Sequence, residues 1–419
     1  MTAKVLLVSS VGWPSVARLA AGFAWASCAV EALAPAGAVV LSSRYLSRWH
    51  SYRALFPLAS LRAAIEAAEP DLLVCCDDRS LSHVLELYRR SAGKRELALL
   101  VERSLGNPRA IPRLISRSNF LAEARAEGIR VPDTMAIGSD EDLDDALALL
   151  GFPAVLKSDG SWGGEGVLFA HNATEAKAAF AKLARSPSRP RSVARALRRR
   201  DAHHLGDAIF PAPRNISAQR FVSGSPAASA FASWQGEIAG AIYYDVIVAE
   251  GAIGPPNVIR RVDCPEIHEA TLKIAKRFGL SGIHGMDFIR DAQGAVHLIE
   301  INPRATQGST LAFGRGRDLP AALAERLTPA AGIRPAITAD TVVFFPREWQ
   351  RDPASHFLTS AHHDVPWDDP AVLLAILRSA ARTAHRSARN LTKEASKTMT
   401  STVCLKRSDT TGGAQRTIR

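Results

Sequence analysis

Cysteine is scarce in this sequence, and its spacing carries little information. Five cysteines occur in 419 residues, an odd number, and none of them pair at the spacing of a metal site. This excludes a disulfide framework and indicates a reducing compartment, so we expect a cytoplasmic protein. The positions are Cys28, Cys75, Cys76, Cys264 and Cys404. Cys75 and Cys76 end the apolar run DLLVCC, which indicates a buried strand and not a redox site.

Long apolar runs are also missing. The longest, Leu19 to Val30, is bounded by Arg18 and Glu31 and is too short to span a bilayer. We predict a core helix there. Lys4 is followed only by the strand-length run VLLVSSV, without a small-residue cleavage site, so we expect no secretory signal.

Aromatic residues make up only 6% of the chain, and they do not accompany its basic segments. The net charge of +11 comes from residues 185–214, with eight arginines against two aspartates, and residues 371–419, with ten Lys or Arg against two acids. Without interleaved aromatics, we expect no specific nucleic-acid partner. Residues 185–214 are expected to be a docking loop or disordered. The tail predicts a basic amphipathic helix, suited to weak contact with a membrane surface or a protein, and disorder beyond Ser396.

Strands and helices alternate in the first hundred residues. Strands are expected at 4–10, 38–43 and 71–76, with helices at 61–69 and 80–90. This alternation predicts a parallel sheet, whose ligand sites lie at the carboxyl ends of its strands. Those ends are Ser9–Gly12 and Cys76–Arg79. No G-x-G-x-x-G motif follows a strand here, so a dinucleotide is not implied.

A glycine-rich loop follows in the middle of the chain, after helices expected at 118–128, capped by Ser118, and at 142–150. In GFPAVLKSDGSWGGEGVLFA, a strand carrying Lys157 enters a loop with four glycines and returns as a second strand. Glycines let backbone N–H groups approach an anion, and the lysine adds positive charge. The alternative is a plain hairpin turn. The glycines are Gly160, Gly163, Gly164 and Gly166.

The stretch from Gly282 to Arg304 predicts a β-hairpin around a turn at residues 291–294. If Arg290 pairs with Ala295, Asp287 stands opposite Leu298. Side chains alternate faces, so the polar residues fall on one face and the apolar ones on the other. The polar face then carries Asp287, Glu300 and Asn302, and the core face carries Met286, Phe288, Ile299 and Ile301.

Two carboxylates and an amide oxygen on one face are suited to a hard cation. Diagonal neighbours on a strand pair lie roughly 7–8 Å apart, within reach of one or two ions. Without a cation, the acids would repel each other and lose hydration. Mg²⁺ fits best because it prefers oxygen ligands and retains contacts to phosphates, with Mn²⁺ as the substitute. The alternative is an exposed sheet face with scattered charges.

Together these segments resemble the ATP-grasp superfamily, in the variety of the carbamoyl-phosphate synthase large chain and biotin carboxylase. The resemblance rests on Lys157 with SDGSWGGEGV, on ISAQRFVSG (Ile216 to Gly224), and on D-x₁₂-E-x-N-x-R from Asp287 to Arg304. It covers roughly Arg113 to Thr328. The implied fold class is mixed α/β and α+β. A parallel-sheet domain (1–110) precedes a two-lobed ATP-grasp domain (111–330, lid lobe about 120–222), and a basic C-terminal extension follows (331–419).

The resemblance also implies roles for particular residues. Asp287, Glu300 and Asn302 stand where the family binds one or two Mg²⁺ ions that bridge the ATP phosphates. Lys157 and Arg117 contact the phosphates, with the glycine flap (Gly163, Gly164, Gly166) over them. The backbone of the adenine hinge comprises Gln219, Arg220, Phe221 and Val222. Arg304 steadies the acyl-phosphate, a task that Arg261 or Arg260 shares.

Some positions depart from the family pattern. Arg220 replaces a frequent hinge acid, and Ser225-Pro226-Ala227 stands where an acid often meets the ribose, which affects nucleotide affinity or base choice. Ala305-Thr306-Gln307 replaces the glutamine and acid of biotin carboxylase, so a bicarbonate-fixing role is not expected. Substrate choice is expected to lie with the loop ends of the first domain and with Thr306 to Arg317.

The expected activity is that of an ADP-forming ligase. A small-molecule carboxylate is activated by ATP as an acyl-phosphate and captured by an amine or a thiol. Two alternatives stay open: a nucleotide-binding regulatory or scaffold protein without turnover, and a peripheral membrane ligase acting on a lipid-linked substrate. The sequence does not specify an oligomeric state.

Overall fold

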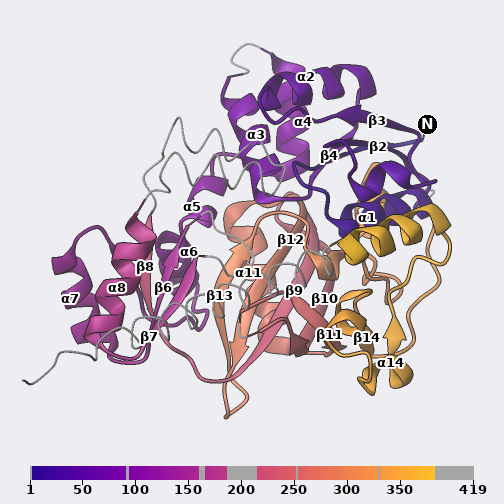
Figure 1. Ribbon diagram of the computed structural model, residues 1–419. Coiled ribbons are helices and arrows are strands. Elements are labelled where there is room, and N and C mark those ends of the chain that lie inside the picture. Colours follow the sequence, from indigo (N-terminus) through magenta and orange to yellow (C-terminus); the bar gives the residue numbers. More distant parts are fainter. Residues whose placement is uncertain are drawn as a thin grey trace, which may run out of the picture.

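The computed structural model describes residues 2–90, 94–159, 166–185, 215–251, 253–328 and 331–382. Three sheets organise this part of the chain: a parallel sheet near the N-terminus, a small antiparallel sheet and a seven-stranded sheet. In Figure 1 the N-terminal sheet lies above the large sheet and the small sheet lies to its left. This arrangement confirms the predicted fold class of a parallel-sheet domain followed by a two-lobed body. Gly163, Gly164 and residues 186–214 lie outside the described residues.

The N-terminal sheet has the strand order β3-β2-β1-β4, with all pairs parallel. Its strands are β1 (Lys4–Val8), β2 (Ala29–Ala34), β3 (Arg48–Ser51) and β4 (Leu72–Cys75). Its helices are α1 (Pro14–Trp25), η1 (Val39–Ser42), α2 (Pro57–Ala68) and α3 (Asp78–Arg89). The predicted strands at 4–10 and 71–76 and both predicted helices are confirmed.

Two predictions in this domain are wrong. The apolar run from Leu19 to Val30 is not one helix, because α1 ends at Trp25, Ser27 takes a φ of 64°, and the chain enters β2 at Ala29. Residues 38–43 are not a strand, because most of them form η1, a short 3₁₀ helix. Val39 and Val40 are buried against the core there, which explains the strand-like composition.

Three helices connect this domain to the small sheet: α4 (Arg95–Leu105), α5 (Ile111–Ile115) and α6 (Arg117–Ala126). The predicted cap of α6 is wrong, since Ser116 and not Ser118 stands at its N-cap, without a side-chain cap bond. This start places Arg117 at the first position of the helix. Its side chain is only 6% exposed.

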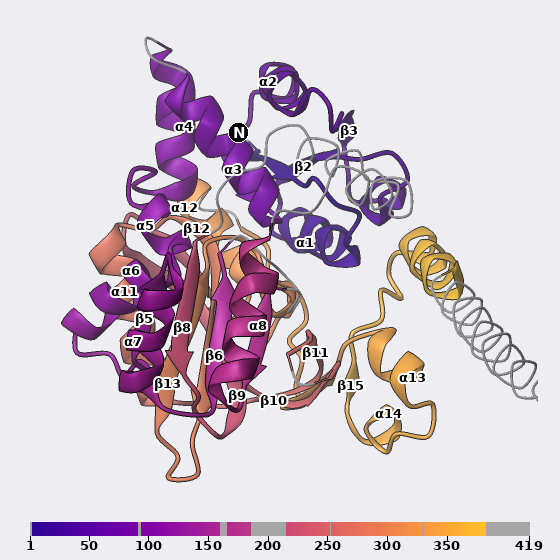
Figure 2. The same ribbon diagram turned by 60° about the vertical axis from the view of Figure 1, so that its left-hand side comes forward.

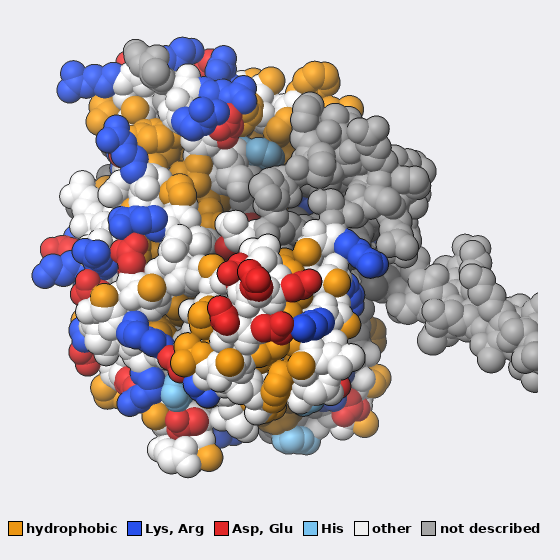
Figure 3. All heavy atoms as spheres, turned by 90° about the vertical axis from the view of Figure 1, so that its left-hand side faces the viewer, with side chains coloured by type: hydrophobic (Ala, Val, Ile, Leu, Met, Phe, Trp, Pro, Cys, Tyr) orange, Lys and Arg blue, Asp and Glu red, His pale blue; other side chains and the backbone are white. Residues whose placement is uncertain are grey.

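The small antiparallel sheet has the order β5-β8-β6-β7. It comprises β5 (Thr134–Ile137), β6 (Ala154–Ser158), β7 (Val167–Ala170) and β8 (Ile216–Arg220), with α7 (Asp140–Leu150) and α8 (Ala173–Ala184) beside it. Ala154 and Leu156 of β6 face these helices. Because side chains alternate, Val155 and Lys157 face the other way. Figure 3 shows acidic side chains gathered on the helix side, where α7 exposes its five acids.

The large sheet has the order β13-β12-β9-β10-β11-β14-β15. Its strands are β9 (Ser225–Trp234), β10 (Glu237–Ala249), β11 (Pro256–Arg261), β12 (Gly282–Arg290), β13 (Val296–Asn302), β14 (Thr341–Val343) and β15 (His362–His363). Helix α11 (Pro265–Phe278) packs on one face and α12 (Leu319–Leu327) on the other. Short helices follow at η2 (Gln307–Thr310), α13 (Arg347–Arg351) and α14 (Phe357–Ser360).

Residues 370–382 form the described part of the predicted basic helix. Val372 and Ile376 are buried in the core shared with α1, and the Asp369 carboxylate accepts a 2.7 Å hydrogen bond from Ser43 Oγ. The apolar side of this helix therefore packs on the body of the protein. In Figure 2 the helix lies to the right of α1. Within the described ranges, no helix has the length and apolar character needed to cross a membrane.

Candidate functional site

One large cavity lies where the three sheets meet. Its volume is about 1320 Å³. Lys157 and Phe169 line it from the small sheet, Asp287 and Glu300 from the large sheet, and Asp78 from the end of β4. The carboxyl ends of the N-terminal strands therefore contribute to this cavity, as the parallel-sheet prediction requires.

The predicted hairpin is present, but its predicted register is wrong by one residue. Arg290 pairs with Val296, and Phe288 pairs with Leu298. Continued without interruption, this register would turn Glu300 onto the core face with Met286. A β-bulge at Ile299 restores the phase, so that Asp287 stands directly opposite Glu300. Ile299, predicted to be in the core, lines the cavity instead.

Asp287, Glu300 and Asn302 are brought together by this bulged pair. Asn302 Nδ2 donates to Asp287 Oδ2 at 2.9 Å. Burial, and then the facing Glu300 carboxylate, raise the pKa of Asp287 to about 6. A cation between the two acids would remove this penalty, and carboxylate and amide oxygens suit Mg²⁺. Within the described ranges, no group of three or more His, Cys, Asp or Glu has the geometry to hold a metal ion, so the donors here are two acids and an amide.

Two cations face these acids. Arg117 Nη2 donates to Glu300 Oε1 at 2.9 Å, and its Nη1 donates to the Ser158 carbonyl at 2.7 Å. Asp159, which the sequence reasoning missed, lies 3.5 Å from Arg117 Nη1. Lys157 is 5% exposed, and burial lowers its pKa to about 8 against the attraction of Glu300. Positive charge is thus concentrated where a triphosphate would meet the hairpin.

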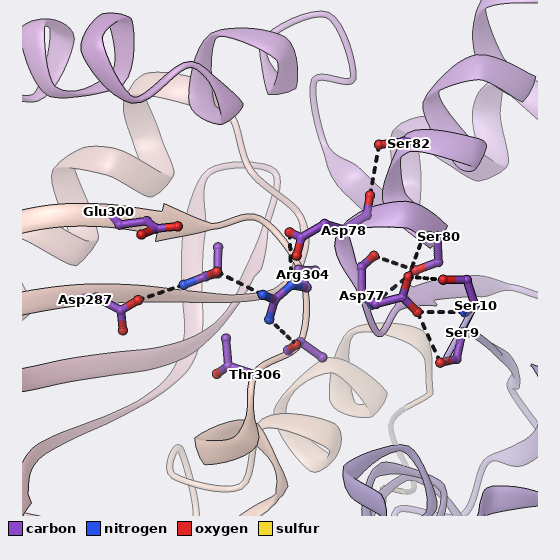
Figure 4. A network of polar contacts seen from close by, with 12 residues as sticks. Ser9, Ser10, Asp77, Asp78, Ser80, Ser82, Asp287, Glu300, Arg304 and Thr306 are labelled. Atoms are coloured by element: carbon purple, nitrogen blue, oxygen red, sulfur yellow. Dashed lines mark hydrogen bonds and ion pairs between the residues drawn. The ribbon is translucent and has the colours of Figure 1, made fainter. Parts of the chain in front are cut away.

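Arg304 joins the hairpin to the N-terminal domain (Figure 4). Its Nη2 donates to Asn302 Oδ1 at 3.1 Å, and its Nε lies 3.1 Å from Asp78 Oδ1. Its guanidinium also stacks over the Trp13 ring, 5.6 Å from the centroid. Asp78 lies at a strand end that the sequence singled out, whereas nothing in the sequence pointed to Trp13. These contacts hold Arg304 beside Asn302 and the hairpin.

The predicted hinge lies along the same cavity at the end of β8. Gln219 Nε2 donates to Thr134 Oγ1 at 3.0 Å, and the Phe221 ring meets the Phe169 ring edge-on at 5.9 Å. Arg220 points its guanidinium elsewhere, toward Asp133 and the Leu150 carbonyl. The charge of Arg220 is therefore paired with Asp133, although the residue lines the cavity. Val222 and the three residues before it line the cavity.

Of the flap glycines, only Gly166 is among the described residues. Its carbonyl accepts a 2.9 Å hydrogen bond from the Ser158 N–H, next to Lys157. This bond ties the return of the loop to the lysine strand. The placement of Gly163 and Gly164 relative to a phosphate stays a prediction.

Arg261 lies away from Asp287 and Glu300, and its catalytic role stays a prediction. Strand pairing places Asp287, Ala228, Tyr244 and Arg261 in one row across β12, β9, β10 and β11. Three strand spacings separate the ends of this row, roughly 14 Å. The Arg261 guanidinium pairs with Asp340 and lies over the Phe313 ring. Neither Arg261 nor Arg260 lines the cavity.

Comparisons with known proteins identify the fold. No family model matches the chain, and no curated protein matches it. Among solved structures, biotin carboxylase from Campylobacter jejuni in an ATP-analogue complex superposes with a TM-score of 0.58, at 14% identity, over 80% of this chain and 74% of that one. N5-carboxyaminoimidazole synthase from Aspergillus clavatus, in complex with ADP and 5-aminoimidazole ribonucleotide, superposes with a TM-score of 0.56. The two chains are 13% identical, and the match covers 81% of this chain and 80% of that one. N5-carboxyaminoimidazole synthetase from Staphylococcus aureus, in complex with ADP, superposes with a TM-score of 0.54 at 13% identity. This match covers 80% of this chain and 79% of that one. The chain therefore has the fold of the ATP-grasp superfamily.

Proposed function

We propose that this protein is a Mg²⁺- and ATP-dependent ligase that activates a carboxylate as an acyl-phosphate and transfers the acyl group to an amine or a thiol. The observation that carries the proposal is the convergence of Lys157, Arg117, Arg304 and the acidic pair on one cavity. Structural similarity at 13–14% identity supports the fold, and these side chains support the chemistry.

The nucleotide would lie between the small antiparallel sheet and the large sheet. The adenine would meet the backbone at Gln219 to Val222, and the phosphates would meet Lys157 and Arg117. Asp287, Glu300 and Asn302 would hold one or two Mg²⁺ ions, which neutralise charge on the phosphates. Arg117, now bonded to Glu300, would contact a phosphate oxygen in the loaded site.

The first step joins a substrate carboxylate oxygen to the γ-phosphorus. The bond from that phosphorus to the β–γ bridging oxygen breaks, and ADP leaves. Arg304 offsets the negative charge of the carboxylate and of the acyl-phosphate, held in position by Asp78 and Trp13. The cationic groups contribute through positioning and charge neutralisation, which dominate phosphoryl transfer.

In the second step, the amine or thiol attacks the acyl carbon. Phosphate leaves, and the nucleophile loses a proton. Buried Lys157, with its pKa near 8, stays largely protonated at neutral pH and keeps its charge beside the phosphates.

The proposal is tested by incubating the full chain with ATP, Mg²⁺ and pooled carboxylates and amines. ADP and phosphate should appear in equal amounts, and Glu300→Ala should abolish both. Glu237→Ala, an exposed change at the start of β10, is the control and should leave the rate unchanged. Release of AMP and pyrophosphate would contradict the acyl-phosphate mechanism.

A further inference from the structure

The cavity extends well beyond the reacting groups. Ligand pockets commonly enclose roughly 300–1,000 Å³, and this one encloses about 1320 Å³. The cavity volume beyond this usual range leaves room for a second ligand beside a nucleotide. Part of its wall, which we name the apolar compartment, is formed by apolar side chains from five separate segments, four of which contribute to one hydrophobic cluster. They are Trp13, Val246, Ile253, Pro255, Phe345 and Ile376.

These segments are far apart in sequence but converge in the fold. Trp13 precedes α1, Val246 lies on β10, Ile253 and Pro255 belong to the β10–β11 connection, and Phe345 follows β14. Ile376 lies on the helix of residues 370–382, beside α1 in Figure 1. Ile253 is 40% exposed, so it offers apolar surface that a ligand could cover.

The charged groups of this compartment are already paired. Arg18 bonds to Asp364, and Arg347 Nη1 lies 3.2 Å from Glu250 Oε2. Both arginines line the cavity, as does Asp364. A phosphate or second carboxylate placed here would have to compete with these ion pairs, whereas a hydrocarbon group would not.

Trp13 connects the compartment to the reaction centre. Its ring lies under the Arg304 guanidinium, 5.6 Å away, and also belongs to the compartment wall. A carboxylate bound at Arg304 would therefore have its substituent next to an aromatic surface.

From this arrangement we propose that the substrate acid carries a bulky aliphatic or aromatic group, which occupies the apolar compartment while its carboxylate meets Arg304. This inference rests on the proposed ligase function, which supplies the role of Arg304. It adds the substrate class: apolar carboxylic acids, and not phosphorylated or dicarboxylic ones.

The test uses the full chain with Mg²⁺ and a non-hydrolysable ATP analogue, titrated calorimetrically with acetate, butanoate, hexanoate and octanoate. Affinity should rise roughly fourfold for each added methylene until the compartment is full. Val246→Asn should weaken octanoate binding by about tenfold or more and leave acetate within about twofold, since burying one valine accounts for this much. Ile247→Asn is the matched control, because Ile247 is the next residue and does not line the cavity.

The outcomes separate the two proposals. Affinity independent of chain length, tighter binding of succinate or a phosphorylated acid than of octanoate, or no effect of Val246→Asn would overturn the apolar compartment. The same acids are then assayed for ADP release with ATP. Octanoate binding with the expected chain-length dependence, but no ADP from any acid, would reject the ligase function and leave the compartment as a binding site.

Discussion

Two aspartates of this molecule, the buried Asp77 and the half-buried Asp287, have opposite surroundings. Asp77, at the end of β4, accepts four hydrogen bonds: from the Ser10 N–H and Oγ at 2.7 Å each, from Ser80 N–H at 2.8 Å, and from Ser9 Oγ at 3.1 Å. Asp287, on β12, accepts one side-chain bond, from Asn302, and faces Glu300. Figure 4 shows Asp77 turned toward Ser9 and Ser10, and Asp287 apart from them on the strand pair that carries Glu300.

The difference separates an acid whose charge is compensated by donors from one that we propose binds a metal ion. Four donors replace the lost hydration of Asp77, join β1 to α3, and cap that helix. Asp287 lacks such compensation, and its raised pKa reflects burial next to another acid. We infer that the missing partner of Asp287 is a cation supplied with the nucleotide.

The strongest test of this comparison is activity. Asp287→Asn keeps the shape of the side chain and removes its charge, so ADP formation should fall by roughly 10²–10³-fold without loss of stability. Exposed Asp263→Asn is the control and should retain the wild-type rate. An active Asp287→Asn protein would place the metal elsewhere.

Asp77 should behave in the opposite way. Asp77→Ala should lower the free energy of unfolding by about 3 kcal/mol, because four buried donors lose their acceptor. Ser139→Ala removes the comparable but exposed cap of α7 and should cost only about 1 kcal/mol. Urea denaturation measures both. If both variants lost the same free energy of unfolding, the burial of Asp77 would not increase the contribution of its hydrogen bonds to stability.

The pH dependence of stability sharpens the contrast. The folded-state pKa of Asp287, about 6, exceeds its ordinary value of 3.8. The native carboxylate is therefore penalised above pH 6, and the penalty disappears as the pH falls toward 4. In EDTA at pH 8, Asp287→Asn should be more stable than wild type by on the order of 2 kcal/mol. This gap should close at pH 4, and a gap independent of pH would contradict the assignment.

The smallest expected effect is stabilisation by metal. With a non-hydrolysable ATP analogue present, Mg²⁺ at ten times its Kd should stabilise wild type by about 1.4 kcal/mol. Asp287→Asn should lose most of this gain, measured by thermal unfolding, and Asp263→Asn should keep it. If Mg²⁺ stabilised all three proteins equally, the Asp287 carboxylate of the hairpin would not be a ligand of the bound Mg²⁺.

The acidic hairpin was predictable because its information is local. Glu300 and Asn302 lie two residues apart on one strand, so they share a face of the sheet in any regular register. The register was not predictable, because the bulge at Ile299 depends on which side chains the neighbouring strands and helices bury. The spacing of Glu300 and Asn302 therefore located the site, although the predicted partner of Asp287 was wrong.

Contacts between distant segments explain the other differences. Arg261 is basic and follows the hinge in sequence, yet two strands, β9 and β10, lie between its strand and that of Asp287. Trp13 meets Arg304 only because the N-terminal domain packs against the large sheet. Residues 38–43 have the composition of a strand, but the position beside β1 is taken by β2. Local patterns do not encode these placements.

The most direct measurement is a crystal structure with Mg²⁺ and a non-hydrolysable ATP analogue. The account predicts a metal ion about 2.0–2.1 Å from carboxylate oxygens of Asp287 and Glu300, with the triphosphate beside Lys157. A nucleotide bound outside this cavity, or a metal ion without contact to either acid, would contradict it.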